Sequence, residues 1–504
     1  MSKLKNLHST EANDTSYDHV LKYTGVFGGV QGLKMLVGAL RMKLTAAIIG
    51  AWGVGLMSAY NSVSEFLNNA SNMGIPLNAT RRTSELFENG TAEEIEHQVM
   101  VIRTWVLWSA FLSVLICLFF SPVISYFFFD HDWTRWPVVM LTSLVAFSHI
   151  VAEGECAILK GLRQVRKVAL IETIIALGTL LCTIPVYLLF GIRGVIVGLI
   201  ACAFLSAAAH FFFSLRLVPY KVRPFSGRIF REGLPLIKIG IPYVLANLSN
   251  AGLQMVIPVI ILASHSMLEL GYYKAAWSLM IGYSGLVFLA LESDYFPRLS
   301  AVNSDRLRMN DTINQQIDVC TLIITPFLVL LVMFMPLVLQ LLYVDEFLVV
   351  TGMATLSVFY VFLRCVSLPM AYSILAKGHS IAYLLLEVCY VLLFCLLFWL
   401  CYNAFGLIGA GIAFSIGAVY DVVVYFLYCH LRYGFKLRRS TMLFCLGQFV
   451  CLLTAVEYCY VVSPSAFEKY TIGGIAFVAS ALLSISRLAR RSSLVRNLFG
   501  RFRR

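Results

Sequence analysis

The chain has 504 residues, of which 59% are hydrophobic and only 13% are charged, and its mean hydropathy is +0.81. This composition excludes an ordinary soluble domain and is typical of a protein whose helices cross a bilayer many times. The net charge of +12 does not indicate nucleic-acid binding, because the cations fall mostly in connections on one predicted side of the membrane.

The first apolar stretch, residues 20–43, follows a polar tail in which we expect no signal peptide. It carries Lys34 and Arg41, which are nearly two helical turns apart and therefore share one helix face. A cation that faces lipid costs about 2.5–3.5 kcal/mol on insertion scales, so the pair predicts a wet cavity that needs positive charge. In the alternative interpretation, Arg41 reaches the outer interface and Lys34 pairs with a carboxylate on another helix.

We predict about 14 transmembrane helices. Most of the 39 lysines and arginines lie in alternate connections, whereas the others hold only Arg135, Arg193 and Lys469. Because cations are retained on the cytoplasmic side, both termini are predicted to be cytoplasmic. The predicted spans are residues 20–43, 47–75, 101–121, 137–159, 168–190, 194–215, 239–262, 271–296, 318–343, 351–376, 381–404, 407–429, 442–463 and 471–487.

Short motifs recur in the same order in the two halves of the chain. They are AILKG at 157–161 and ILAKG at 374–378, FGIRG at 190–194 and FGLIG at 405–409, and Pro76 and Pro297. Such recurrence indicates two six-helix lobes in the same orientation. We therefore predict an all-α polytopic membrane protein with two lobes in a parallel pseudo-repeat. Its predicted parts are an N-terminal tail (1–19), a first lobe (20–216), a basic linker (217–238), a second lobe (239–431), two extra helices (442–487) and a basic tail (488–504).

Three segments on the predicted cytoplasmic side have surface character. Residues 91–101 and 305–319 show helical apolar spacing with polar faces, so we expect two short, separate surface helices. The tail 488–504 is basic with interleaved Leu and Phe, which is typical of binding to anionic lipids at the cytoplasmic face. A solvated, disordered tail is the alternative.

Four cations within the spans are candidates for substrate binding: Lys34, Arg41, Lys274 and Arg364. Several of them in one cavity would suit a phosphate-bearing substrate, because each donates strongly to phosphate oxygens. Lys274 could instead lie at the outer interface, and Arg364 could pair with Glu387 of the next helix.

Acidic and amide side chains mark a second set of candidates. Glu65 lies among Asn61, Asn68 and Asn69, and this polar helix face is expected to line the cavity. Acids within the spans can couple transport to a proton or sodium gradient, or pair with a neighbouring helix. The candidates for ion coupling are Glu153, Asp294 and Asp421.

Several possible chemical motifs carry little weight. Asp130-His131-Asp132 is similar to the D-x-D of metal-dependent glycosyltransferases, but its outer loop is too short for a catalytic platform. The 13 cysteines lie in apolar stretches without C-x-x-C spacing, which favours small buried residues over metal ligands or disulfides. No nucleotide-binding loop is present, so we expect no metal, no cofactor and no direct ATP drive.

Three stretches together resemble a known family. They are GVFGGVQGLKMLVGALRMKLTAAIIGAWGVGLMSAYNSVSEFLNNASNMGIPLNATR, GYYKAAWSLMIGYSGLVFLALESDYFPRLSAVN and SLPMAYSILAKGHSIAYLLLE. The chain resembles Wzx-type O-antigen and polysaccharide translocases of the multidrug/oligosaccharidyl-lipid/polysaccharide exporter superfamily, to about residue 440. The resemblance implies two six-helix lobes arranged as a V. It also implies that the chain flips an undecaprenyl-pyrophosphate-linked oligosaccharide from the cytoplasmic to the periplasmic leaflet of a bacterial inner membrane, for lipopolysaccharide or another surface polysaccharide.

The resemblance also suggests site residues and partners. Related lipid II flippases carry an arginine in the first helix, which Arg41 matches, and another at the start of helix eight, near Lys274. The sequence departs from them at Met42, where they have an acid, so their ion-pair scheme does not transfer directly. The polysaccharide polymerase and chain-length machinery are the implied protein partners.

Two other functions were weighed. A cation-coupled multidrug exporter of the same superfamily should prefer an acidic first-lobe cavity, and the cations of the first span argue against it. A membrane glycosyltransferase or polymerase, acting through Asp130 and Asp132, is disfavoured by the short outer loops. The sequence therefore predicts a flippase and not an enzyme.

Overall fold

The computed structural model describes residues 17–129, 132–264, 267–282, 285, 288, 295–296, 298–462 and 465–491. The regular elements in these ranges are all helical. Nine helical stretches among them are long and apolar enough to cross a membrane. Three of the nine, Gly29–Ser71, Arg166–Leu215 and Ser380–Tyr433, have 43, 50 and 54 residues, about twice what one crossing requires. The chain is therefore an all-helical, multi-pass membrane protein, and the number of 14 spans stays a prediction.

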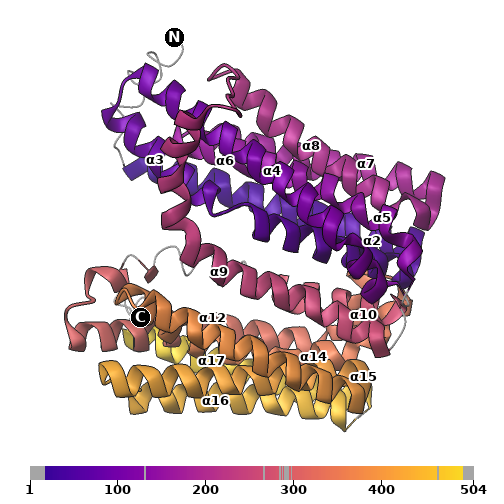
Figure 1. Ribbon diagram of the computed structural model, residues 1–504. Coiled ribbons are helices and arrows are strands. Elements are labelled where there is room, and N and C mark those ends of the chain that lie inside the picture. Colours follow the sequence, from indigo (N-terminus) through magenta and orange to yellow (C-terminus); the bar gives the residue numbers. More distant parts are fainter. Residues whose placement is uncertain are drawn as a thin grey trace. The chain divides into compact units, whose positions relative to one another are not determined.

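The chain divides into two compact units, Met1–Gly271 and Tyr272–Arg504. In the first unit, α6 packs against α3, α4 and α8, and α7 packs against α2 and α8 (Figure 1). α9 packs against α2, α3 and α4 of the same unit. The helices are α2 (Tyr17–Ser71), α3 (Ile75–Asn89), α4 (Ala92–Phe128), α5 (Trp136–Met140), α6 (Thr142–Gly161), α7 (Val165–Phe190), α8 (Val195–Leu215) and α9 (Gly227–Ser264), followed by α10 (Met267–Trp277), which runs into the second unit.

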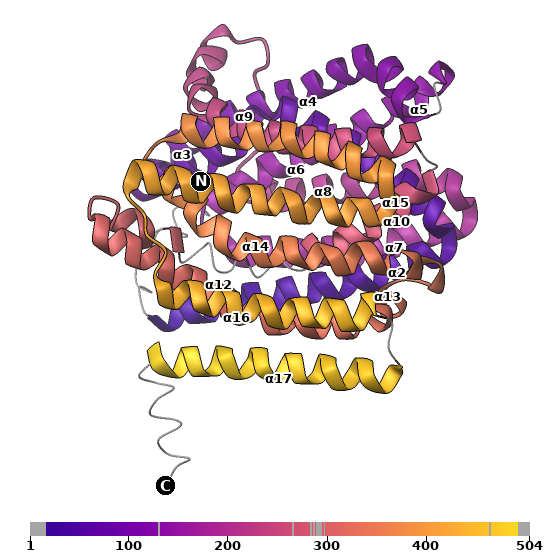
Figure 2. The same cartoon turned by 90° about the horizontal axis from the view of Figure 1, so that it is seen from below.

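In the second unit, α14 packs along α15, while α12 contacts α14, α16 and α17 (Figure 2). Its helices are α12 (Arg306–Met333), α13 (Met335–Leu342), α14 (Thr351–Ala376), α15 (Ser380–Tyr433), α16 (Arg439–Val456) and α17 (Ala466–Arg491). The division into units falls after α9, whereas the predicted second lobe begins at residue 239. The predicted lobe boundaries, 20–216 and 239–431, stay predictions.

Glycines with positive φ interrupt the longest helices. α2 bends at Gly50 (φ 66°, ψ −177°) and α15 at Gly406 (φ 58°, ψ −136°). Only glycine adopts this backbone without steric cost, so each break lies where the sequence supplies one. The break at Gly406 falls between the predicted spans 381–404 and 407–429, whereas the break at Gly50 lies just inside the predicted span 47–75.

The two halves of the chain share this backbone geometry at related positions. Gly191, which follows α7, has φ 55° and ψ −135°, almost the values of Gly406. The ends of α6 and α14 also match, with positive φ at Arg163 (57°) and Gly378 (77°). The differences 406 − 191 and 378 − 163 both give 215 residues. The structure thus aligns the halves at a constant offset of 215 residues, whereas the predicted pairing of Lys160 with Lys377 gives an offset of 217. The predicted pairing of Pro76 with Pro297 is not tested, because Pro297 lies outside the described residues.

The two predicted surface helices are not separate elements, so this prediction is wrong. Residues 91–101 and 305–319 are the caps and first turns of α4 and α12, which continue without a break into the spans. No glycine or proline separates each amphipathic turn from the apolar run, and extending a helix costs less than starting a new one. The separate surface helix is α3, which starts after Gly74 with Pro76 in its first turn.

Candidate functional site

Lys34, in the first half of α2, has a partner on α7. Its Nζ lies 2.5 Å from Oε2 of Glu172, and the two side chains are 36% and 24% exposed. The contact joins α2 to α7 at a partly exposed surface. The pairing foreseen as the alternative for Lys34 is therefore present.

Arg41 differs from Lys34 in its surroundings. It is half-buried on α2, close enough to Tyr187 of α7 and Cys202 of α8 to act on both electrostatically. In the described part of the chain it has neither a hydrogen-bond nor an ion-pair partner. Lys34 and Arg41 thus share the side of α2 that faces α7 and α8, and Arg41 is the cation whose donors remain available.

The polar face of the second half of α2 meets α6. The amide Nδ2 of Asn68 donates to Oε1 of Glu153 over 2.9 Å, and Nδ2 of Asn69 donates to the backbone carbonyl of Glu65. Glu65 itself is exposed. A cavity of about 580 Å³ lies beside this face, lined by Asn69, Asn72, Pro76, Leu77, Thr80, Arg81, Glu153, Cys156, Ala157 and Lys160. Asn69 of the predicted polar face therefore lines the same cavity as the candidate coupling residue Glu153, within the first unit.

A second polar cluster lies inside the second unit. Nη1 of Arg364 on α14 is 3.3 Å from Oδ2 of Asp421 on α15, and the side chains are 29% and 5% exposed. Glu387, the partner foreseen for Arg364, instead accepts a hydrogen bond of 2.7 Å from the hydroxyl of Tyr425. The predicted binding residue Arg364 and the predicted coupling residue Asp421 therefore form an ion pair. Because a guanidinium carries five N–H donors, this pair leaves Arg364 able to contact another anion.

Two candidates remain, Lys274 and Asp294. Lys274 is half-buried on α10, and Asp294 lies outside the described residues. The structure brings Lys34 and Arg41 to one face, Asn68 and Glu153 into contact, and Arg364 and Asp421 into contact.

Sequence reasoning missed a buried ion pair in the first unit. Nε and Nη2 of Arg103 on α4 lie 2.8 and 3.0 Å from the two carboxylate oxygens of Glu155 on α6. Nη1 of Arg103 also donates to the carbonyls of Val218 and Pro219, so the guanidinium holds the start of the linker. Arg103 lies inside α4, near the start of the predicted span 101–121. The signal was the unbroken helical pattern from residue 92 onward.

A comparable contact anchors the last helix of the second unit. Nη2 of Arg487 on α17 lies 3.0 Å from both carboxylate oxygens of Asp318 on α12. The side chains are 13% and 3% exposed. The last helix, α17, is therefore tied to α12 by a largely buried ion pair that the sequence did not indicate.

Asp132 is the one acid of the predicted outer-loop motif that lies within the described residues. Asp132 accepts hydrogen bonds from the backbone and hydroxyl of Thr134, and caps the short helix Trp133–Arg135. Both bonds hold the pKa of Asp132 below its usual value, and the bond from the Thr134 hydroxyl has the larger effect. Asp130 and His131 lie outside the described residues. Among the described residues no cluster of three or more His, Cys, Asp or Glu could hold a metal ion.

Comparisons with solved structures identify the fold. A multidrug-resistance MATE family transporter of the MOP superfamily, in an inward-facing conformation, is 16% identical with a TM-score of 0.61; the match covers 78% of this chain and 94% of that one. The lipid II flippase MurJ, in an inward closed conformation, is 16% identical with a TM-score of 0.60, covering 92% and 98%. A MOP-superfamily transporter from Pyrococcus furiosus with a binding pocket of reversed polarity is 15% identical with a TM-score of 0.53, covering 81% and 93%. The fold is thus that of transporters and flippases.

Sequence comparison identifies the family. No curated protein matches the chain significantly. A family model described as "Polysaccharide biosynthesis protein" matches residues 48–351, which is more than half of the chain. The chain belongs to this polysaccharide biosynthesis protein family and has the fold of MOP-superfamily transporters.

Proposed function

We propose that the protein is a flippase for an undecaprenyl-pyrophosphate-linked oligosaccharide, the repeat unit of an O-antigen or related surface polysaccharide. It moves this lipid from the cytoplasmic to the periplasmic leaflet of the bacterial inner membrane, with both termini in the cytoplasm. The family supports a role in polysaccharide biosynthesis. The observation that carries the choice of an anionic substrate is Arg41, a half-buried cation in a spanning helix without a counter-ion among the described residues.

In this proposal the pyrophosphate binds to the cations of the spans. Arg41 can donate to a phosphate oxygen without breaking an existing pair, whereas Lys34 must exchange Glu172 for the substrate. Lys274 and Arg364 are the candidates from the second unit. The sugar occupies the wet cavity beside the polar face that includes Glu65, and the prenyl chain stays in lipid. Alternating access results from rocking of two lobes about the bound head group.

Gradient coupling is proposed at the membrane acids. Glu153 borders the cavity of the first unit and is held by Asn68. Asp421 is held by Arg364, so protonation of Asp421 would weaken that pair and release the guanidinium for substrate. Asp294 keeps its place as a sequence-based candidate. The polysaccharide polymerase and chain-length machinery are the proposed partners that use the flipped lipid.

Reconstituted vesicles test the function. Labelled prenyl-pyrophosphate oligosaccharide is scored for exposure on the far leaflet with wild type, with Lys34→Ala/Arg41→Ala, and with Arg193→Ala as the control at an exposed arginine between α7 and α8. We expect transport by wild type and the control, and loss in the double variant. Transport that survives in the double variant would refute the cationic site. Uptake of cationic drugs by wild type, with no flipping of several prenyl-pyrophosphate sugars, would favour the multidrug exporter.

A further inference from the structure

A basic cavity lies at one end of the second unit, away from the Arg364–Asp421 pair. Its volume is about 340 Å³, at the lower end of the range for small-molecule sites. It lies where α12, α14 and α15 meet, at the start of α12 and the ends of the other two. Its lining consists of Arg306, Met309, Asn310, Ile313, Lys377 and residues 429–435.

The charged groups of this cavity are all cationic. Arg306, Lys377 and Arg432 line it, His430 adds an imidazole, and the lining contains no carboxylate. Arg432 is exposed and has no polar partner among the described residues. Arg306 donates to the carbonyl of Gly434, and Lys377 donates to the carbonyl of Asn303. Backbone carbonyls orient these two cations but do not neutralise them.

The nearby acids are already engaged elsewhere. Asp305 caps α12 and lies 3.3 Å from Arg308, and Asp311 pairs with Arg438. Neither acid lines the cavity. The local positive charge is therefore left for an anion that the chain itself does not supply.

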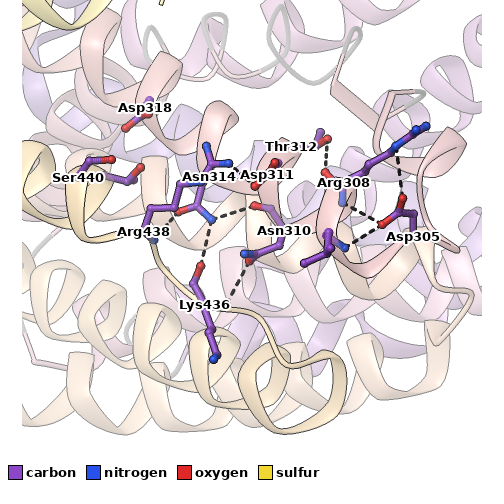
Figure 3. Close-up of polar contacts among 12 residues, drawn as sticks. Asp305, Arg308, Asn310, Asp311, Thr312, Asn314, Asp318, Lys436, Arg438 and Ser440 are labelled. Carbon is purple, nitrogen blue, oxygen red and sulfur yellow. Dashed lines mark hydrogen bonds and ion pairs between the residues drawn. The ribbon is translucent and has the colours of Figure 1, made fainter.

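The backbone around the cavity is held firmly. The side chain of Asn314 donates to the carbonyl of Lys436 and accepts from the N–H of Arg438, at 3.1 and 2.9 Å (Figure 3). Oδ1 of Asn310 accepts from the N–H of Lys436 over 3.1 Å (Figure 3). The connection after α15 is thus fixed along the first turns of α12. The cavity wall formed by residues 429–435 is preorganised for this reason.

The internal repeat shows that the fold does not require these cations. At the offset of 215 residues, Lys377 corresponds to Leu162 and Arg432 to Leu217. Leu162 belongs to the apolar core of the first unit, and Leu217 packs against it. Two of the three cavity cations thus have leucines at the corresponding positions of the first half, next to Arg163 and Arg216 in the sequence.

Apolar side chains beside the cations indicate the source of the anion. Leu431, in the lining, is 74% exposed, and Leu307, next to Arg306, is 78% exposed. A free phosphate would gain nothing from these leucines, whereas a phospholipid would place acyl chain against them. We propose that this cavity binds the phosphate head group of an anionic phospholipid. The site is distinct from the basic tail 488–504 and does not depend on the substrate of the flippase.

Thermal unfolding of the purified full chain in detergent tests the site. The ligands are short-chain phosphatidylglycerol, short-chain phosphatidylcholine and inorganic phosphate, each titrated separately. We expect phosphatidylglycerol to raise the unfolding midpoint of wild type, because a ligand that binds the folded state stabilises it. A cation near a membrane surface contributes about 1 kcal/mol to the binding free energy of an anionic lipid. Arg432→Gln should therefore raise the phosphatidylglycerol concentration for the half-maximal shift about fivefold, and Arg306→Gln/Arg432→Gln should raise it more than about twentyfold.

Arg308→Gln is the matched control, because Arg308 is an exposed arginine on α12, the helix of Arg306, and lies outside the cavity. It should titrate like wild type, and phosphatidylcholine and phosphate should shift wild type much less than phosphatidylglycerol. A phosphate shift as large as the lipid shift, lost in Arg432→Gln, would overturn the lipid as the source and assign the site to a free anion. Absence of any shift in wild type, or equal titrations of Arg432→Gln and Arg308→Gln, would overturn the site. Arg432→Gln removes no hydrogen bond or ion pair within the described part of the chain, so misfolding does not obscure the result.

Discussion

Removal of the Arg103 side chain should destabilise the first unit strongly. Arg103 and Glu155 are 2% and 4% exposed, and their contact is bidentate. Truncating one partner of a buried pair leaves an uncompensated charge and costs about 3–5 kcal/mol. Arg103→Ala also removes the hydrogen bonds that Arg103 donates to Ser214 Oγ and to the carbonyls of Val218 and Pro219. We therefore expect a cost at the upper end of that range.

Denaturation of the purified protein in detergent measures this cost. Arg81→Ala is the control, because Arg81 and its partner Glu85 are 71% and 45% exposed, and such pairs contribute about 0–1 kcal/mol. Arg103→Met/Glu155→Leu should recover most of the loss, since it removes both buried charges. If Arg103→Ala lowered the unfolding midpoint no more than Arg81→Ala does, the buried ion pair could not have the role assigned to it.

Three further perturbations have defined outcomes. Gly406→Ala places a side chain at φ 58° and should cost about 1–2 kcal/mol of stability, whereas Gly474→Ala, mid-helix with open space at the β-carbon position, should not lower the unfolding midpoint. Arg487→Ala breaks the buried ion pair with Asp318 and should loosen α17, measured as faster hydrogen exchange in Ala466–Arg491; unchanged exchange would contradict the anchoring role. Glu172→Gln removes the competitor of the substrate for Lys34, so it should lower the substrate concentration for half-maximal flipping; a raised value would show that Glu172 assists binding instead.

Hydropathy and glycine placement predicted much of the fold. The predicted breaks near Gly50 and Gly406 are present because a lone glycine between apolar runs allows a backbone that other residues resist. The prediction of separate surface helices at 91–101 and 305–319 was wrong because the change from polar to apolar residues was taken as the end of a helix. The chain there continues as helix, and a helix can be amphipathic at one end and apolar at the other.

Partners across helices could not be read from the sequence. One alternative paired Arg364 with Glu387, whereas its ion pair is with Asp421, since the partner of a helical residue depends on the rotation and crossing of two helices. The same reason hid Arg103–Glu155 and Arg487–Asp318, whose members are 52 and 169 residues apart. The shared face of Lys34 and Arg41 was predictable, because helical periodicity alone determines it.

The central claim is that Arg41 holds the pyrophosphate of a lipid-linked oligosaccharide. The measurement that tests it most directly is flipping in reconstituted vesicles by wild type, Arg41→Ala and Arg41→Lys. The account predicts that flipping is lost in Arg41→Ala and partly restored in Arg41→Lys, because the positive charge returns without the planar, multidentate donors of arginine. Flipping by Arg41→Ala at the wild-type rate would contradict the claim.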